Sequence, residues 1–453
     1  MSLDNLPVEW LNVKISDVTV KGEQRKPNDS EEFIYVDIGS INRDLKKIES
    51  PQFLLGKDAP SRARKVIKRG DILVSLTRPN LNAVALVGEN YDQQIASTGF
   101  EVISPMFVES KYLFSLVRTQ NFINEISKQE QGALYPAAKS SDVQAYEFPL
   151  PPLAEQQEIV RQLDVMLAQV EQIKARLDAI PAIIKKFRQS VLADAVSGKL
   201  LEQDVNFTNY KLSEISEFQN GYAFKSNWFT KEGDHQVIKL GNIRDDFLYI
   251  ENAPSFVEVE VANQFKKFKP NVGDLLISMT GTRFKQDYGY VCQVSEDANL
   301  LINQRVGRII PNKTLVNSSY LLLCLRSDLF RQEFFKGETG GVNQGNVGSK
   351  HIEQIELNIP SLEYQNGIVD LTDTLFRSVE HIDASTQSAQ KRVNLLTQSI
   401  LAKAFSGELT AEWREQHQEL ITGINSAESL LAKIQKEREA SKPVKKAKKA
   451  KAV

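Results

Sequence analysis

The chain contains few of the residues from which metal sites and disulfide frameworks are built. Its 453 residues include only two cysteines, Cys292 and Cys324, and four histidines. The cysteines have no other ligand-like residues beside them, and the histidines are scattered without the spacing of metal ligands. We therefore expect neither a disulfide framework nor a metal site.

Long apolar runs and an excess of one charge are also missing. No apolar stretch is long enough to cross a bilayer, and no signal-peptide pattern is present at the start. Lysine and arginine total 56 and aspartate and glutamate 58, so the net charge is −2. Any affinity for nucleic acid must then come from local patches or from partner subunits. The composition predicts a cytoplasmic protein of two to four domains.

Motifs for binding nucleotides or transferring methyl groups are absent. There is no Gly-x-x-x-x-Gly-Lys-Ser/Thr sequence, and the glycines between Gly337 and Gly348 lack both the lysine and the strand-to-helix context. We expect a flexible loop there. The Asn/Asp-Pro-Pro-aromatic tetrapeptide of adenine methyltransferases is missing too. The sequence therefore predicts a chain that performs no chemistry itself and holds no cofactor.

The dominant pattern is a seven-residue apolar repeat between Pro151 and Leu200. Two interleaved rows of this kind form the seam of a helix that packs on another helix. The first row is Leu163, Val170, Leu177, Ile184 and Val191, and the second is Met166, Ile173, Ile180 and Phe187. Pro181 predicts a kink or a local break. A helix from Leu153 to Ser197 would span roughly 65–70 Å.

The same pattern recurs 209 residues later. Gln189–Leu200 and Gln398–Leu409 share eight of twelve residues at this constant offset. The offset places Thr372, Val379, Thr386, Val393 and Ile400 in the first row, and Leu375, Ile382, Ala389 and Leu396 in the second. Two related helices can pair with each other, most simply antiparallel. Two independent amphipathic helices are the alternative, which the fixed offset disfavours.

The segments that precede the two helices also share a framework. Val36–Ile41 corresponds to Ile238–Ile243, and Gly70–Ser75 corresponds to Gly273–Ser278. The framework includes a strand that ends in a turn, a turn at Gly70-Asp71 before a β-rich run, and a helix over Tyr112–Ile126. The residues between the framework pieces differ completely. This pattern indicates two sites of one kind with different specificities.

The helical motifs resemble the DNA-specificity subunit of type I restriction–modification enzymes. The resemblance rests on Leu150-Pro151-Pro152-Leu153-Ala154-Glu155-Gln156-Gln157, on Ser197-Gly198-Lys199-Leu200, on Asn220–Ser226 and on Gly407–Thr410 with Trp413. The chain departs from the family at Glu9, where glycine is usual before the tryptophan. It departs again at Pro360–Gln365, which replaces the double-proline opening.

The resemblance implies an α+β architecture, in which two mixed α/β target-recognition domains are separated by two long conserved helices packed as an antiparallel coiled coil. The corresponding segments are 1–150, 151–200, 201–359 and 360–439, followed by a disordered basic tail over 440–453. The functional alternative for this tail is an arm that binds DNA phosphates.

The resemblance also implies a division of labour among subunits. The chain performs no catalysis, and each target-recognition domain reads one half of a split, asymmetric sequence in double-stranded DNA. Two modification subunits dock on the helices and methylate adenine N6 with S-adenosylmethionine. Two motor-nuclease subunits, which use ATP and Mg²⁺, can join them.

We selected candidate DNA-contacting residues by side-chain type, because Arg and Lys suit phosphates and guanine while Asn and Gln suit adenine. In the first domain they are Arg62, Arg64, Lys65, Arg78, Asn80 and Asn82. Tyr135 and Lys139 are added because their segment resembles the loop that precedes the closing strand in family members. In the second domain they are Lys225, Arg283, Lys285, Gln286, Asn303, Gln304, Arg305, Asn343, Gln344 and Asn346.

A different class of function is a coiled-coil scaffold that joins two binding globules without DNA specificity. The ordinary net charge favours it, whereas the duplicated framework with divergent loops opposes it. A self-contained methyltransferase is disfavoured by the missing tetrapeptide.

Overall fold

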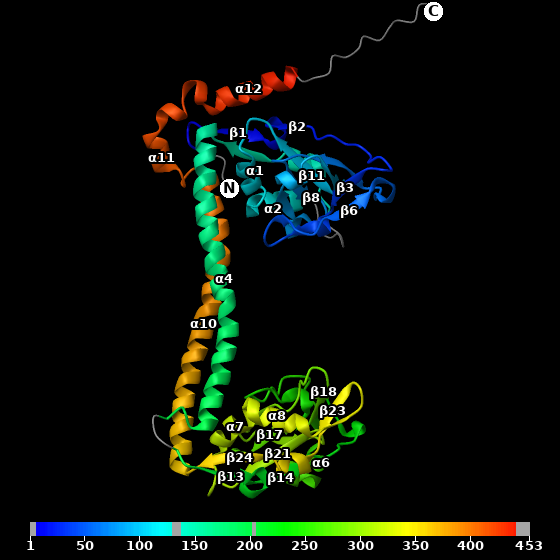
Figure 1. The fold of residues 1–453 in the computed structure, drawn as a ribbon, viewed down its shortest axis with the longest axis vertical. Coiled ribbons are helices and arrows are strands. Elements are labelled where there is room, and N and C mark those ends of the chain that lie inside the picture. Colours follow the sequence, from blue (N-terminus) through cyan, green and yellow to red (C-terminus); the bar gives the residue numbers. More distant parts are fainter. Residues whose placement is uncertain (1–5, 129–136, 202–204, 441–453) are drawn as a thin grey trace, which may run out of the picture. The chain divides into compact units, whose positions relative to one another are not determined.

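The computed structural model describes residues 6–128, 137–201 and 205–440. The chain divides into two compact units, the first made of residues 1–177 and 389–453 and the second of residues 178–388. Each unit combines one mixed α/β domain with parts of two long helices, α4 and α10 (Figure 1). The segment boundaries drawn from the sequence stay predictions.

The first domain is closed by a pairing of its two ends. Strand β1 (Leu11–Lys14) runs antiparallel to β12 (Glu147–Leu150), directly before α4. Between these ends lie two four-stranded sheets with the orders β6-β3-β10-β7 and β2-β11-β8-β9 and a small β4–β5 hairpin. The strands are β2 (Thr19–Val20), β3 (Glu32–Val36), β4 (Ile41–Asn42), β5 (Lys47–Ile48), β6 (Gln52–Leu55), β7 (Ala63–Ile67), β8 (Ile72–Ser75), β9 (Val84–Leu86), β10 (Gln94–Ser97) and β11 (Phe100–Pro105).

The single helix expected over Tyr112–Ile126 is in fact two helices. They are α1 (Ser110–Leu116) and α2 (Gln120–Ser127), and α3 (Ser140–Gln144) follows later. The break occurs because the Thr119 hydroxyl accepts a hydrogen bond from the Phe122 backbone N–H and so caps a new helix. Apolar spacing alone did not reveal this cap.

The second domain repeats this plan. Its ends pair as β13 (Phe207–Lys211) and β24 (Glu356–Pro360). Its sheets have the orders β14-β21-β17-β19, β16-β15-β20 and β18-β23-β22. The other strands are β14 (Ser216–Asn220), β15 (His235–Ile238), β16 (Phe256–Val257), β17 (Leu275–Ser278), β18 (Thr280–Thr282), β19 (Val291–Gln293), β20 (Leu300–Ile302), β21 (Val306–Pro311), β22 (Glu338–Gly340) and β23 (Gln344–Val347), and the helices are α5 (Leu212–Ile215), α6 (Val259–Gln264), α7 (Ser318–Arg326), α8 (Asp328–Lys336) and α9 (Ser349–Glu353).

Strand pairs, turns and helix caps are duplicated along with the topology. Strands β3 and β10 form a parallel pair, as do β15 and β20. The turns before β8 and β17 both place glycine in the left-handed region, with φ +89° at Gly70 and +94° at Gly273. Ser327 caps α8 as Thr119 caps α2, by accepting from the Phe330 backbone N–H. The duplicated framework predicted from the sequence is confirmed.

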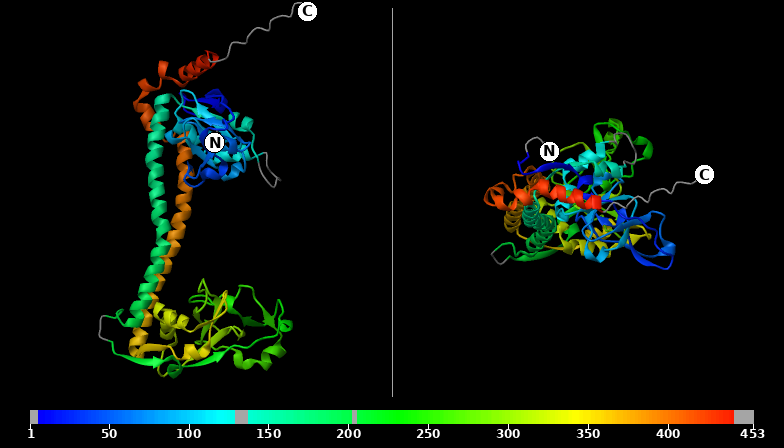
Figure 2. Two further views of the ribbon diagram at one scale, coloured as in Figure 1. Left: turned by 45° about the vertical axis from the view of Figure 1, so that its right-hand side comes forward. Right: turned by 90° about the horizontal axis from the view of Figure 1, so that it is seen from above.

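The two long helices are α4 (Leu153–Ser197) and α10 (Leu362–Ser406), of 45 residues each. Within each unit their segments lie side by side and run in opposite directions (Figure 2). Helix α4 continues through Pro181, so the prediction of a local break there is wrong. Proline removes one backbone donor, and the hydrogen bonds and packing on either side are enough to keep the helix continuous.

The two apolar rows of these helices are not equally buried. Leu163, Val170, Val191, Val379, Val393 and Ile400 of the first row are buried, while Leu177 and Ile184 are half-buried. In the second row Met166, Ile180 and Leu375 are half-buried, whereas Ile173, Phe187, Ile382 and Leu396 are exposed, by 41% to 50%. Two helices alone cover a narrow stripe, so the outer row stays accessible.

Each domain shares a core with its helix segments. In the first unit the rings of Tyr112 and Phe405 lie 5.0 Å apart, in a core that also includes Phe148 and Ile159. In the second unit the core combines α7 residues with Leu192 and Ile368. Each domain is thereby fixed rigidly to its own helix segments.

A buried carboxylate joins both ends of the described chain in the first unit. Glu155 is fully buried and accepts hydrogen bonds from Trp10 Nε1 (2.8 Å), Thr410 Oγ1 (2.7 Å) and Arg414 Nε (2.9 Å). After α10 the chain continues through α11 (Ala411–Gln416) and α12 (Ala427–Ala440). Ala440 therefore belongs to a helix and not to the predicted tail, whose remaining residues lie outside the described part.

Candidate nucleic-acid interface

The loop that follows β8 carries the exposed candidates of the first domain. Arg78 and Asn80 are exposed, and Arg78 adopts a left-handed conformation with φ 48°. A β-bridge links Thr77 to Ala137, and the Ala138 N–H donates to the Leu76 carbonyl at 2.8 Å. These bonds bring exposed Lys139 to the same end of the sheet. Tyr135 lies outside the described residues.

Asn82, a candidate for base contact, has a structural role instead. Its side chain is buried, and Nδ2 donates to the Val117 carbonyl at 2.8 Å. The Asn82 carbonyl accepts from Lys46 Nζ at 2.7 Å. Burial, with a smaller effect from the nearby Arg118 charge, lowers the pKa of Lys46 to about 8. Residue type alone could not separate buried Asn82 from exposed Asn80.

The basic run at the start of β7 is partly used inside the protein. Lys65 Nζ forms an ion pair with Glu101 at 3.0 Å, and both side chains are nearly buried. Arg64 donates from Nη1 to the neighbouring Ala63 carbonyl at 2.8 Å. Arg62 is exposed. Strand β7 belongs to a different sheet from β8, so these residues do not extend the loop that carries Arg78.

In the second domain the glycine-rich segment is a β-hairpin and not the flexible loop predicted. Strands β22 and β23 pair with each other, and β23 also pairs with β18 through Thr280↔Asn346 and Thr282↔Gln344. The glycines permit close backbone approach, since a Cβ on Gly340 would lie 2.3 Å from the Gln344 carbonyl oxygen.

This three-stranded sheet gathers most candidates of the second domain. The Arg283 N–H donates to the Asn343 carbonyl at 3.4 Å, so the ends of β18 and β23 lie side by side. Exposed Phe284 and Val342, at 78% and 75%, lie in the same connections. The candidates on these strands and connections are Arg283, Lys285, Gln286, Asn343, Gln344 and Asn346, all exposed except half-buried Asn346.

A second group lies in the turn between β20 and β21. The Arg305 carbonyl accepts from the Met279 N–H at 3.0 Å, and the Met279 carbonyl accepts from the Val347 N–H at 2.9 Å. Gln304 and Arg305, both exposed, are thus connected through Met279 to the β23 strand. Asn303 is buried, which disfavours it as a base reader.

Lys225 is exposed and lies apart from the turn in sequence. Its Nζ lies 5.1 Å from the centre of the Trp228 ring. This cation–π contact holds the ammonium group at the surface without neutralising its charge.

The side chains that could hold a metal ion or act as nucleophiles form no site of their own among the described residues. Among the described residues, no group of three or more His, Cys, Asp or Glu side chains is placed to hold a metal ion. Cys292 and Cys324 are buried free thiols, and burial raises the pKa of each to about 12. In the described part of the chain, no helix combines the length and apolar character needed to cross a membrane.

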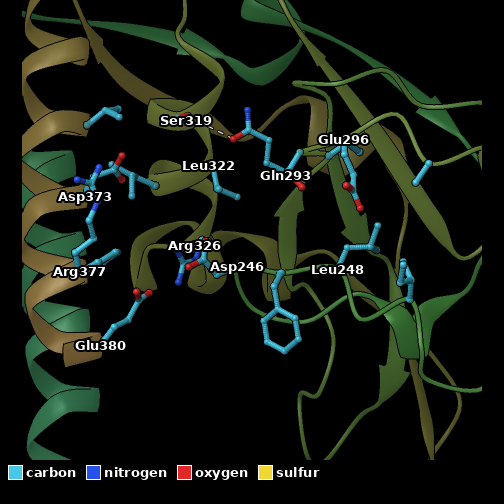
Figure 3. Close-up of a pocket in the computed structure, with 18 of the residues that line it drawn as sticks. Asp246, Leu248, Gln293, Glu296, Ser319, Leu322, Arg326, Asp373, Arg377 and Glu380 are labelled. Carbon is cyan, nitrogen blue, oxygen red and sulfur yellow. Dashed lines mark hydrogen bonds and ion pairs between the residues drawn. The ribbon is translucent and has the colours of Figure 1, made fainter. Parts of the chain in front are cut away.

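A cavity of about 540 Å³ lies between α7 and α10 in the second unit (Figure 3). Arg326 on its wall is nearly buried and forms ion pairs with Asp245 at 3.0 Å and Asp246 at 2.7 Å. Asp373, Arg377 and Glu380 enter it from α10 (Figure 3). None of its lining residues is a candidate DNA contact.

Comparison with known proteins gives a consistent result. Residues 7–182 and 204–389 each match the model of the type I restriction modification DNA specificity domain. The EcoKI specificity subunit of Escherichia coli K12 is 30% identical over 470 residues, which cover 97% of this chain and 98% of that protein. The EcoBI specificity subunit of Escherichia coli is 36% identical over 317 residues, 65% of each protein.

Solved structures agree in fold. A chain from a type I R-M system superimposes with a TM-score of 0.72 at 27% identity, covering 88% of this chain and 98% of that one. The HsdS subunit from Thermoanaerobacter tengcongensis gives a TM-score of 0.64 at 27% identity, with 89% and 98% covered. The two family matches cover both domains and their adjoining helix segments, and the chain therefore belongs to the type I restriction–modification DNA-specificity family.

Proposed function

We propose that the chain is the sequence-specific DNA-binding subunit that recognises a split, asymmetric target and directs adenine-N6 methylation and restriction by partner subunits. One observation carries the proposal. The same framework position presents Arg78 and Asn80 after β8 in the first domain and Arg283 after β17 and β18 in the second, where the hairpin paired with β18 adds Asn343 and Gln344. Equivalent surfaces with different side chains suit two different half-sites.

The exposed side chains suit base readout in the major groove. Arginine can donate two hydrogen bonds to guanine, and asparagine or glutamine can pair with both Hoogsteen-edge groups of adenine. In the second domain, Arg283, Asn343 and Gln344 lie where β18 and β23 of the three-stranded sheet meet, and strands are among the elements that read bases from this groove. The lysines beside them, Lys139 and Lys285, suit phosphate contacts.

The helices support a role in fixing the register between half-sites. Each domain shares a core with segments of α4 and α10, and both helices are continuous. Helices that continue from one domain to the other would set one number of unread base pairs, which a flexible linker could not do.

The exposed residues in the second apolar row of α4 and α10 support docking of partner subunits. Each unit exposes apolar residues on its helix segments, Ile173 and Leu396 in the first and Phe187 and Ile382 in the second. Similar surfaces in the two halves suit two copies of one modification subunit. Those subunits would bind S-adenosylmethionine, and two restriction subunits would supply ATP- and Mg²⁺-dependent translocation and cleavage. Such a complex would work in the cytoplasm, where the DNA is.

Domain exchange tests the proposal. The complex with its modification subunits is prepared with residues 1–150 taken from a relative, and its methylated sequence is determined. We expect one half-site to change while the other half and the spacer remain. A change in both halves would contradict the assignment of one half-site to each domain.

Salt dependence separates this function from the scaffold alternative. Retention of the complex on duplex DNA should fall steeply with salt, because phosphate contacts release counterions. A scaffold without DNA specificity would show no steep slope and no preference among duplexes.

A further inference from the structure

A carboxylate at the start of the β22–β23 hairpin restrains one candidate arginine. Glu338 begins β22, and its side chain is only 14% exposed. Its Oε2 accepts a hydrogen bond from Arg283 Nε at 3.0 Å, and its Oε1 accepts from the Tyr288 hydroxyl at 2.5 Å. Arg283 remains 43% exposed. The guanidinium is therefore held on one side and open to solvent on the other.

Tyr288 anchors this carboxylate to the domain core. The tyrosine is fully buried, and its ring packs edge-on against Phe334 at 5.8 Å and Phe335 at 5.1 Å. Burial, followed by the hydrogen bond to Glu338 and its charge, raises the pKa of Tyr288 above its usual value. The protonated hydroxyl is the donor in this hydrogen bond. Glu338 thus has a rigid support.

Gly345 leaves room for the contact. A Cβ there would lie 2.3 Å from the Tyr288 hydroxyl oxygen and 2.4 Å from Glu338 Oε1. The strand opposite β18 must have glycine at this position for the tyrosine and the carboxylate to meet. The arrangement therefore involves two segments that are distant in the sequence, the connection after β18 and the β22–β23 hairpin, which together fix one side chain.

Holding arginine through Nε has a specific consequence. The two terminal amino groups make no hydrogen bond with the described residues, and they form the planar fork that matches the O6 and N7 atoms of guanine. Exposed Phe284 and Val342 beside it supply apolar surface that a base or its methyl group can cover. A side chain that is already ordered loses less entropy on binding.

We propose that Glu338, supported by Tyr288, is a positioning residue that presents Arg283 to a guanine in the half-site read by the second domain. This inference rests on the proposed function. A phosphate contact is the competing role for Arg283. Base readout is favoured because phosphate contacts tolerate a flexible side chain, whereas base readout needs fixed geometry.

The test compares Arg283→Ala, Glu338→Ala, Glu338→Gln and the double variant Arg283→Ala/Glu338→Ala. Each is measured as the whole complex with its modification subunits. The methylation kcat/KM is determined on duplexes in which each base pair of the second half-site is replaced in turn. Glu333→Gln is the matched control, because the Glu333 carboxylate forms a surface ion pair with Lys336 in the same domain, away from Arg283 in the sequence, and the substitution leaves its backbone contact with His351 in place.

Arg283→Ala should reduce discrimination at one G·C position by roughly ten- to hundredfold. Glu338→Ala should reduce it at the same position by a smaller factor, and the double variant should equal Arg283→Ala. Glu338→Gln keeps the side-chain shape and an acceptor, so it should fall between wild type and Glu338→Ala. The control should keep wild-type discrimination.

Two results would overturn the inference. An equal loss on every duplex, with a shallower salt slope, would make Arg283 a phosphate contact. Additive effects of the two substitutions would make Glu338 merely structural. If the wild-type complex did not discriminate at any position of the second half-site, the proposed function itself would fail, which is a distinguishable outcome. Melting temperatures of all variants identify any that fails to fold, and Glu338→Gln then carries the test.

Discussion

Gln156 and Gln365 make the same pair of hydrogen bonds, each from the first turn of its own long helix. Gln156 accepts from the Glu109 N–H at 3.0 Å and donates to the Pro151 carbonyl at 2.8 Å. Gln365 accepts from the Asn317 N–H at 2.7 Å and donates to the Pro360 carbonyl at 2.8 Å. Both glutamines are fully buried. Each fastens the start of a domain helix to the junction that begins a long helix.

Replacing these glutamines should loosen one domain at a time. Gln156→Leu leaves a buried donor and acceptor unpaired, which costs about 1–3 kcal/mol. We expect faster hydrogen exchange at the Glu109 amide and no change at Asn317, and the reverse for Gln365→Leu. The exposed neighbour Gln157, changed to Leu, is the control. Equal effects on both amides would contradict separate roles.

The Glu155 cluster should determine whether the C-terminal segment stays attached to the first domain. Arg414→Met leaves a buried carboxylate without its cation, a change that costs about 3–5 kcal/mol. Limited proteolysis should then cleave between α11 and α12 much faster than in wild type. Glu155→Gln in the same chain should restore part of the resistance, because it removes the uncompensated charge. No restoration would mean that packing, and not the ion pair, holds the segment.

Alanine substitutions at Asn80 and Asn82 should affect different properties, discrimination in the first case and stability in the second, although the residues lie two positions apart. Asn82→Ala removes the bond to Val117 and forces alanine into a left-handed conformation, so the melting temperature should fall. Asn80→Ala should leave the melting temperature unchanged and weaken discrimination at the first half-site only. Thermal unfolding and methylation of altered duplexes provide the two readouts. Lost discrimination without lost stability in Asn82→Ala would reverse the assignment.

Lys46 should make the free energy of unfolding depend measurably on pH. Burial lowers its pKa from 10.5 to about 8, so the folded chain releases this proton before the unfolded chain does. The cost of the buried charge is present below pH 8 and disappears between pH 8 and 10.5, so stability rises with pH in that window. Comparison with Lys46→Met isolates this contribution in urea unfolding. If the free energy of unfolding changed with pH in the same way in wild type and in Lys46→Met, the result would contradict a lowered pKa for Lys46.

Repetition was the part of the fold that sequence could predict. The offset of 209 residues and the turns at Gly70 and Gly273 follow from patterns that local geometry requires. The hairpin at Gly337–Gly348 was missed because glycine lowers strand propensity, while the pairing with β18 that stabilises it is non-local.

The candidate interface was predictable only by residue type. Arg283 was found because arginine suits guanine, but Glu338 and Tyr288 lie 55 and 50 residues from the groups they hold, and no local signal links them. Burial likewise removed Asn82, Asn303 and Lys65 from the exposed set, since pairing in three dimensions decides which polar side chains remain available.

A genome-wide map of N6-methyladenine, with the gene intact and with it deleted, tests the central claim most directly. We predict one split motif, with two half-sites at a fixed spacing, that is methylated in the first case and lost in the second. An unchanged map, in cells that express the modification subunit, would contradict a role in directing methylation.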